Sequence, residues 1–188
     1  VFLRVSLELP LKRYIIGGFP KVFALNKCFR NEGIDATHNP EFTLMEWYEA
    51  FTDYEDQMER FEALTCHIVQ SLTGGMKLMF QGREIDLTPP WKRIRVPEVI
   101  EEIFGRPFAE IDRSALTAEL DAAMSDEKLS YIGISRDQFR AELAEARLGN
   151  LVMEKVEKHL EDTGRLWDPC FLCDHPRDIS PLTKVKRG

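Results

Sequence analysis

Hydrophobic and polar positions alternate in the first part of the chain, as they do in strands with one buried face. This pattern predicts strands over residues 1–9, 21–32 and 41–51. Residues 10–16 instead predict a short helix, with a proline near its start and two glycines after its end. The segment 33–40 is rich in Gly, Asp, Thr, Asn and Pro and predicts a loop. The strands on either side of this loop therefore predict an antiparallel hairpin.

Helical spacing replaces alternation after this hairpin. A small second hairpin is expected over 77–87, with its turn at Gln81 and Gly82, and a last strand is expected over 169–175. Apolar residues three and four positions apart predict helices over 53–72, 96–104, 114–124 and 136–163, the last interrupted near Gly149. Strands at both ends predict an α+β fold, in which an antiparallel sheet is flanked by helices and carries a mostly helical insertion.

Composition narrows the function classes. With 188 residues, 44% of them hydrophobic and 30% charged, the chain suits a soluble globular domain. Its net charge of -7 argues against a protein that coats nucleic acid, because such a protein would be basic. No apolar run approaches the ~18 residues that a membrane span needs, so we expect no membrane partner and a cytoplasmic location.

Four cysteines are spread along the chain, which suits a reducing cytosol better than a disulfide framework. Cys170 and Cys173 form a single CxxC motif. In a strand their sulfurs would face opposite ways, so buried small side chains are favoured over a zinc site. No metal site is expected within this chain.

The first predicted hairpin carries charge where a core face would be apolar. Residues two apart share a strand face, so Arg30 lies with Glu32 on one strand. The neighbouring strand aligns Phe42, Glu46 and Tyr48. A guanidinium binds phosphate or carboxylate through paired hydrogen bonds, an aromatic ring stacks on a flat base, and a carboxylate beside a phenol holds an ammonium. Scattered surface ion pairs are the alternative, but they do not explain why two aromatic rings share the charged face.

The sequence of this hairpin resembles motif 2 of the class II aminoacyl-tRNA synthetases, in its lysyl-tRNA synthetase form. The matching residues are FRNEG followed by HNPEFTLMEWY, preceded by LRVSLELPLKRYIIGGFPKVFALNKC. DISPLTK, residues 178–184, resembles a later segment of the same family. The resemblance implies an incomplete class II catalytic core, with motif 2 in residues 1–87, a mostly helical insertion in 88–163 and a return to the core in 164–188.

The resemblance implies four ATP contacts. Arg30 would hold the α-phosphate together with the substrate carboxylate, and would stabilise the charge that develops during the reaction. Glu32 would bind the amino group of adenine, and Phe42 would stack on the adenine ring. His38, in the loop, would lie near the outer phosphates.

The resemblance also implies a lysine site. Glu46 and Tyr48 would hold the ε-ammonium group, Glu8 would receive the α-amino group, and Arg30 would bind the carboxylate. The implied reaction is ATP-dependent formation of lysyl-adenylate, followed by transfer of lysine to tRNA(Lys). The full protein would act as a homodimer that uses ATP with Mg2+.

Four parts of the family pattern are not found in this sequence: motif 1, the anticodon-binding barrel, the acidic segment that binds magnesium, and the glycine-rich motif 3 with its second ATP-binding arginine. We therefore expect an internal segment of a catalytic domain that is nearly inactive alone, with its magnesium ligands outside it. Two alternatives stay open. One is the synthetase-like paralogue that lysylates elongation factor P, and the other is a non-catalytic synthetase-like binding protein.

Overall fold

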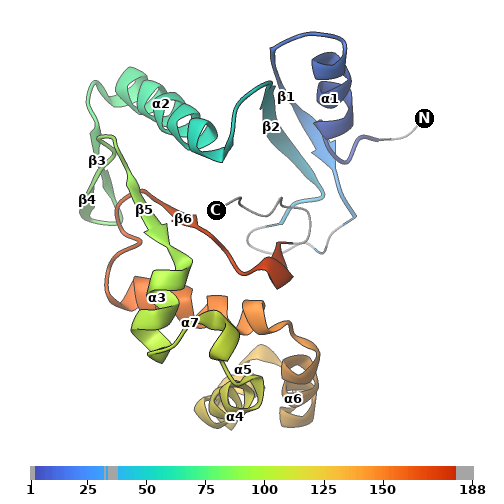
Figure 1. The fold of residues 1–188 in the computed structure, drawn as a ribbon, viewed down its shortest axis with the longest axis vertical. Helices are drawn as coiled ribbons and strands as arrows, with labels where there is room; N and C mark the ends of the chain where they lie inside the picture. Colours follow the sequence, from blue (N-terminus) through green and yellow to red (C-terminus); the bar gives the residue numbers. More distant parts are fainter. Residues whose placement is uncertain (1–2, 32, 34–37, 181–188) are drawn as a thin grey trace. The chain divides into compact units, whose positions relative to one another are not determined.

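The computed structural model describes residues 3–31, 33 and 38–180. The chain forms two compact units, Val1–Arg60 and Phe61–Gly188. Helices and strands are mixed in both units (Figure 1). No helix in the described part of the chain has the length and apolar character needed to cross a membrane.

The first unit contains helix α1 (Glu8–Ile16) and strands β1 (Lys21–Phe29) and β2 (Glu41–Glu49). The strand expected over 1–9 is wrong, since residues 3–7 form no strand and the helix begins at Glu8. Leu7 and Leu11 lie one helical turn apart and are both buried, whereas Leu3 and Val5 are exposed. Contact with the sheet therefore selects helical spacing over the local alternation.

Strands β1 and β2 form the expected antiparallel hairpin, in which Cys28 pairs with Phe42 and Val22 pairs with Tyr48. Both strands end two to three residues earlier than the alternation predicted. Their even-numbered side chains face α1. The buried cluster of this unit consists of Leu7, Leu11 and Cys28, with Val22, Ala24, Phe42, Leu44 and Tyr48 packed against it.

Helix α2 (Tyr54–Thr73) matches the helix expected over 53–72. The side chain of Asp53 accepts hydrogen bonds from the backbone N–H groups of Glu55 and Asp56 and so caps its start. Strands β3 (Lys77–Phe80) and β4 (Arg83–Asp86) form the expected second hairpin. Both residues of its turn, Gln81 and Gly82, have positive φ.

A parallel pair of strands also forms in the second unit. Strand β5 (Lys92–Arg95) pairs with β6 (Cys170–Cys173), so the sheet structure is not wholly antiparallel as expected. The sequence predicted β6 but not β5. Strand β5 contains one apolar residue, Ile94, which is buried. The strand that β5 pairs with, β6, lies far along the chain.

The described part of the second unit also contains helices α3 (Val96–Phe104), α4 (Arg113–Ala123), α5 (Asp126–Ile132), α6 (Arg136–Glu145) and α7 (Leu148–Asp162). There are also two short 3-10 turns, η1 (Phe108–Glu110) and η2 (Arg177–Ile179). The helix expected over 136–163 is two helices. They separate at Ala146 and Arg147, where Arg113 donates hydrogen bonds to the carbonyl groups at the end of α6.

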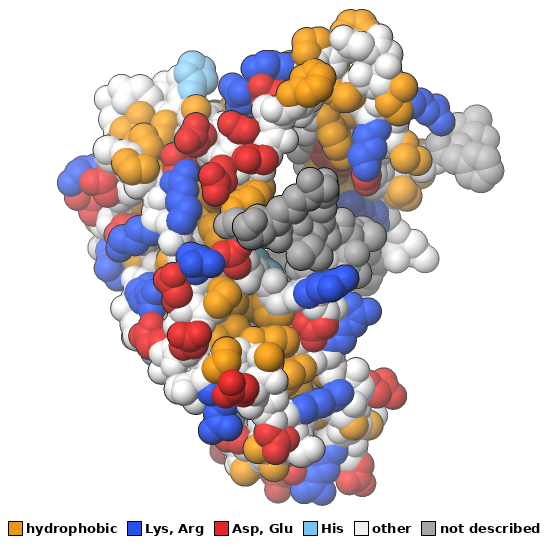
Figure 2. All heavy atoms as spheres, viewed as in Figure 1, with side chains coloured by type: hydrophobic (Ala, Val, Ile, Leu, Met, Phe, Trp, Pro, Cys, Tyr) orange, Lys and Arg blue, Asp and Glu red, His pale blue; other side chains and the backbone are white. Residues whose placement is uncertain are grey.

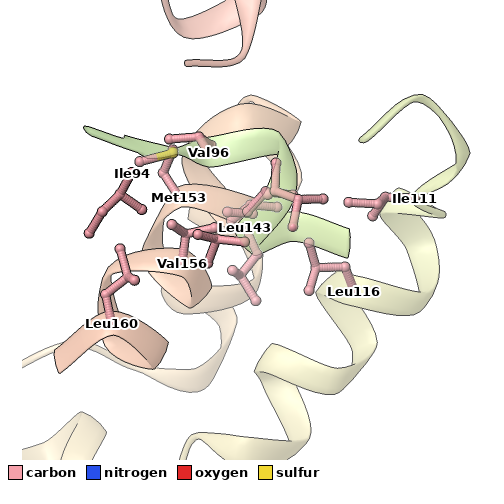
Figure 3. Packing of buried hydrophobic residues seen from close by; sticks show 12 residues of the cluster. Ile94, Val96, Ile111, Leu116, Leu143, Met153, Val156 and Leu160 are labelled. Carbon is pink, nitrogen blue, oxygen red and sulfur yellow. The ribbon is translucent and has the colours of Figure 1, made fainter. Parts of the chain in front are cut away.

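The core of the second unit lies mainly between α3 and α7 (Figure 3). Its buried members are Ile94, Val96, Val99, Ile100, Ile111, Leu116, Leu143, Leu151, Val152, Met153, Val156 and Leu160. Figure 2 shows acidic and basic groups interspersed on the visible face.

Candidate functional site

The predicted site residues of β2 share one face of the hairpin. Phe42, Glu46 and Tyr48 alternate along the strand and are all half-buried. This is the face that α1 covers. Arg30 directly follows β1 and extends the pairing, because its backbone N–H donates to the carbonyl of Pro40 at 2.9 Å. The hairpin therefore brings a guanidinium, two aromatic rings and a carboxylate to one unit of the fold.

Glu46 connects the middle of β2 to the residues before α1. Its Oε1 accepts hydrogen bonds from the hydroxyl of Ser6 at 3.1 Å and from the backbone N–H of Leu7 at 3.3 Å. The Ser6 hydroxyl oxygen in turn accepts from the backbone N–H of Glu8 at 3.1 Å. Glu46 thus places the start of α1, and with it Glu8, over the sheet.

Tyr48 lies beside three charged groups. Burial raises the pKa of its phenol above the ordinary value, the carboxylates of Glu8 and Glu46 raise it further, and the Lys12 ammonium opposes them. The ammonium of Lys12 is 5.9 Å from the centre of the Tyr48 ring and forms an ion pair with Glu8. This pairing raises the pKa of Lys12. The phenol therefore stays protonated at neutral pH, in surroundings that accept a cation.

Arg30 contacts Phe42, the residue that the resemblance places under adenine. The central carbon of its guanidinium is 5.2 Å from the centre of the Phe42 ring. Its Nε donates to the carbonyl of Val5 at 3.2 Å, while the side chain as a whole remains exposed. An exposed guanidinium beside an aromatic ring can bind an anion and stack on a planar group.

Two of the predicted ATP contacts, Glu32 and His38, belong to the segment between β1 and β2. Glu32 and residues 34–37 lie outside the described residues, so the structure does not place the predicted adenine contact. His38 is described and is exposed.

Metal binding has no support in the described part of the chain, where no three His, Cys, Asp or Glu residues come together as a possible site. Cys170 and Cys173 are both half-buried free thiols. Burial raises the pKa of the Cys170 thiol, which disfavours the thiolate that a metal requires. Neither cysteine is therefore assigned as a metal ligand.

One cavity of the second unit contains none of the predicted site residues. It has a volume of about 500 Å³ and is lined mostly by apolar side chains of the β3–β4 hairpin and of residues 166–172. The Trp167 indole N–H is buried and has no hydrogen-bond partner within the described structure. Arg83 lies 4.5 Å from the centre of the Trp167 ring.

Sequence reasoning missed Ser6 and Lys12. The four-residue spacing of Glu8 and Lys12 is the signal that could have identified Lys12, since such residues are neighbours on a helix surface. The expectation of a strand over 1–9 hides this spacing, because it separates Glu8 from the helix.

The comparisons with known proteins agree on one family. A model of class II tRNA synthetases (D, K and N) matches residues 1–188. The lysine--tRNA ligase of Clostridium novyi is 40% identical over 189 residues, which cover 100% of this chain and 34% of that protein. The lysine--tRNA ligase of Clostridium acetobutylicum is 41% identical over 186 residues, 99% of this chain and 34% of that protein. The chain thus spans about a third of the length of the curated relatives it matches.

Proposed function

The chain belongs to the class II tRNA synthetases of the D, K and N group, and on this premise we propose that it supplies the motif 2 part of a lysine--tRNA ligase. The proposed reaction is ATP-dependent activation of lysine to lysyl-adenylate, followed by transfer to tRNA(Lys). The names of the relatives at about 40% identity support lysine as the amino acid. They also favour tRNA over elongation factor P as the acceptor.

The observation that carries the proposal is the arrangement of polar groups on the α1 side of the β1–β2 hairpin. Phe42 lies near the start of β2, with Arg30 beside it. Glu46 lies four residues further along β2, which at the rise of a strand is roughly 13 Å from Phe42. Glu8 and Tyr48 join Glu46 at that second position. A ligand with a planar base and an anion at one end and an ammonium at the other can contact both groups.

In the proposed mechanism, the chain's residues bind and orient the reactants. Arg30 holds the lysine carboxylate near the α-phosphate and neutralises charge as the carboxylate oxygen attacks phosphorus in line and pyrophosphate leaves. Glu46 and Tyr48 hold the ε-ammonium, and Glu8 binds the α-amino group. Phe42 stacks on adenine, Glu32 binds its amino group, and His38 contacts the outer phosphates. No covalent bond to the protein forms.

The proposal extends to the whole protein. Residues 1–87 and 164–188 are proposed as parts of an antiparallel catalytic core flanked by helices, with 88–163 as its insertion. The family resemblance also implies ATP with Mg2+, tRNA(Lys), a homodimer and a cytoplasmic location. Since no described cluster fits magnesium, we assign no step of the reaction to a metal held by this chain.

Lysine-dependent exchange of pyrophosphate into ATP tests the proposal. The chain as its gene encodes it is compared with its Glu46→Gln variant. We expect the variant to raise the KM for lysine strongly, because the ammonium loses its carboxylate. Glu41→Gln is a matched control, since Glu41 is on the same strand but exposed and paired with Lys27. No lysine-dependent exchange in the unmodified protein, or equal KM values for both variants, would refute the proposed lysine site.

The segment 1–188 alone should show little or no exchange. The proposed magnesium ligands and a second ATP-binding arginine are expected outside it, and loss of one positioned donor alone typically lowers the rate ~10²–10³-fold. Equal rates for residues 1–188 and for the gene-encoded chain would place the essential groups within this segment.

A further inference from the structure

Lys12 lies beside two groups of the proposed amino-acid site, although nothing in the proposed reaction requires it. It is one helical turn after Glu8, and its ammonium forms an ion pair with the Glu8 carboxylate. The same ammonium is 5.9 Å from the centre of the Tyr48 ring. Glu8 and Tyr48 are two of the groups proposed to hold the amino groups of lysine. A lysine side chain of the protein thus contacts groups that are assigned to the substrate.

The surroundings distinguish this pair from an ordinary pair on a solvent-facing helix. Helix α1 packs on the sheet through Leu7 and Leu11, and Glu8 and Lys12 each directly follow one of these buried residues. The Lys12 side chain therefore reaches the ring of Tyr48 on β2. Arg13, the next residue, has no ion pair within the described structure, so proximity in sequence alone does not produce this contact.

The pair is also open to exchange. The side chains of Lys12 and Glu8 are 51% and 47% exposed, so solvent and ligands reach both. An exposed ion pair between flexible side chains contributes little to stability and can be replaced by another cation at the same carboxylate.

We propose that Lys12 is an internal competitor for the substrate's α-amino group: its ammonium pairs with Glu8 until the ammonium of an amino acid displaces it. This inference rests on the proposed function, because it uses Glu8 as the amino-group ligand. The Glu8 carboxylate remains neutralised before and after the exchange. A ligand without an α-ammonium cannot replace Lys12, so the contact selects for amino acids with a free α-amino group.

Calorimetric binding of L-lysine to the gene-encoded chain tests the inference. Lys12→Met removes the competitor, so the Kd for L-lysine should fall about two- to fivefold, the range that corresponds to an exposed ion pair. Lys12→Arg retains the charge and should leave the Kd unchanged. Arg13→Met is the matched control, since it removes the same charge one residue away, and it should change the Kd by less than about twofold.

A second ligand identifies the amino group concerned. 6-Aminohexanoate has the ε-ammonium and the carboxylate of lysine but no α-amino group. Lys12→Met should therefore strengthen binding of L-lysine and not of 6-aminohexanoate. Equal gains for the two ligands, no gain for L-lysine, or weaker binding of L-lysine would each overturn the inference. The last result would show that Lys12 positions Glu8 for the ligand.

Glu8→Gln separates failure of the inference from failure of the proposed function. If Glu8→Gln leaves lysine binding unchanged, the proposed amino-group site is wrong. If Glu8→Gln weakens lysine binding but Lys12→Met does not strengthen it, only the competitor role fails. In the Glu8→Gln background, Lys12→Met should have no further effect, because the carboxylate for which the two ammonium groups compete is gone.

Discussion

The two units of this chain build their buried faces in different ways. In the second unit, α3 and α7 contribute mostly aliphatic side chains, and Val152, Val156 and Leu160 are completely buried. In the described part of the first unit, the buried cluster contains Leu7, Leu11 and Cys28, while Glu46 and Tyr48 occupy the same sheet face. A face that carries polar groups loses hydrophobic stabilisation and gains ligand chemistry. We therefore expect substitutions in the second unit to act on stability, and substitutions on the hairpin face to act on binding.

The largest effect is expected from the core of the second unit. Leu160→Ala removes a fully buried side chain of α7 and should lower the free energy of unfolding by about 2–5 kcal/mol. Urea unfolding followed by circular dichroism measures this change. Leu72→Ala is the matched control, since Leu72 is 80% exposed near the end of α2 and should change stability little. Equal losses for the two variants would show that burial does not distinguish the sites.

Arg30→Ala tests the other side of the comparison. Arg30 is exposed, but it is proposed to neutralise charge in the reaction. We expect pyrophosphate exchange by the gene-encoded chain to fall about 10²–10³-fold, with little change in Tm. Arg4→Ala serves as a control, because Arg4 is also exposed and has no proposed role. A loss of activity explained by unfolding would remove the distinction between the units.

A smaller effect is expected where η2 contacts α7. The backbone N–H of Gly149 donates to Oδ2 of Asp178 at 2.8 Å, and a Cβ atom at position 149 would lie 2.3 Å from Oδ1 of Asp178 and 2.8 Å from Cγ2 of Ile179. Gly149→Ala should therefore cost about 1–3 kcal/mol of stability through overpacking. Gly75→Ala provides a comparison, because a Cβ there meets no atom within 4 Å. Urea unfolding of both variants decides whether the close approach matters.

The smallest effect concerns pH. Hydrogen bonds from Arg140 lower the pKa of Asp121, and Arg136 lowers it further. The folded-state pKa of Asp121 lies below its unfolded value, so the ionised carboxylate stabilises the folded state. This stabilisation is fully present above the ordinary carboxylate pKa range and is lost as pH falls through the lowered pKa. Asp121→Asn should therefore weaken the dependence of Tm on pH between about pH 5 and pH 3. An unchanged slope would show that these surface pairs do not contribute to acid lability.

Much of the candidate site could be predicted from alternation within β2. The two-residue period places Phe42, Glu46 and Tyr48 on one face whatever the strand packs against, and the structure has them on one face. The same reasoning works for strongly periodic helices, and α3 has the bounds that the pattern predicted. Periodicity does not predict α5, because seven residues are too few to establish a helical period. The local signals for this helix are Ser125, which caps its start, and Gly133, which follows its end.

Other features depend on partners that are distant in sequence. Ile94 is the single apolar residue of β5, and only pairing with β6 makes this segment a strand. Residues 3–9 alternate as a strand would, yet the helix begins at Glu8, because Leu7 and Leu11 bury themselves against Cys28. The position of Lys12 beside Tyr48 follows from that packing. Periodicity is a property of the local backbone, so the chain's pattern specifies which residues share a face. Which faces meet depends on burial between distant segments, so the contact of Lys12 with Tyr48 exists only in the folded chain.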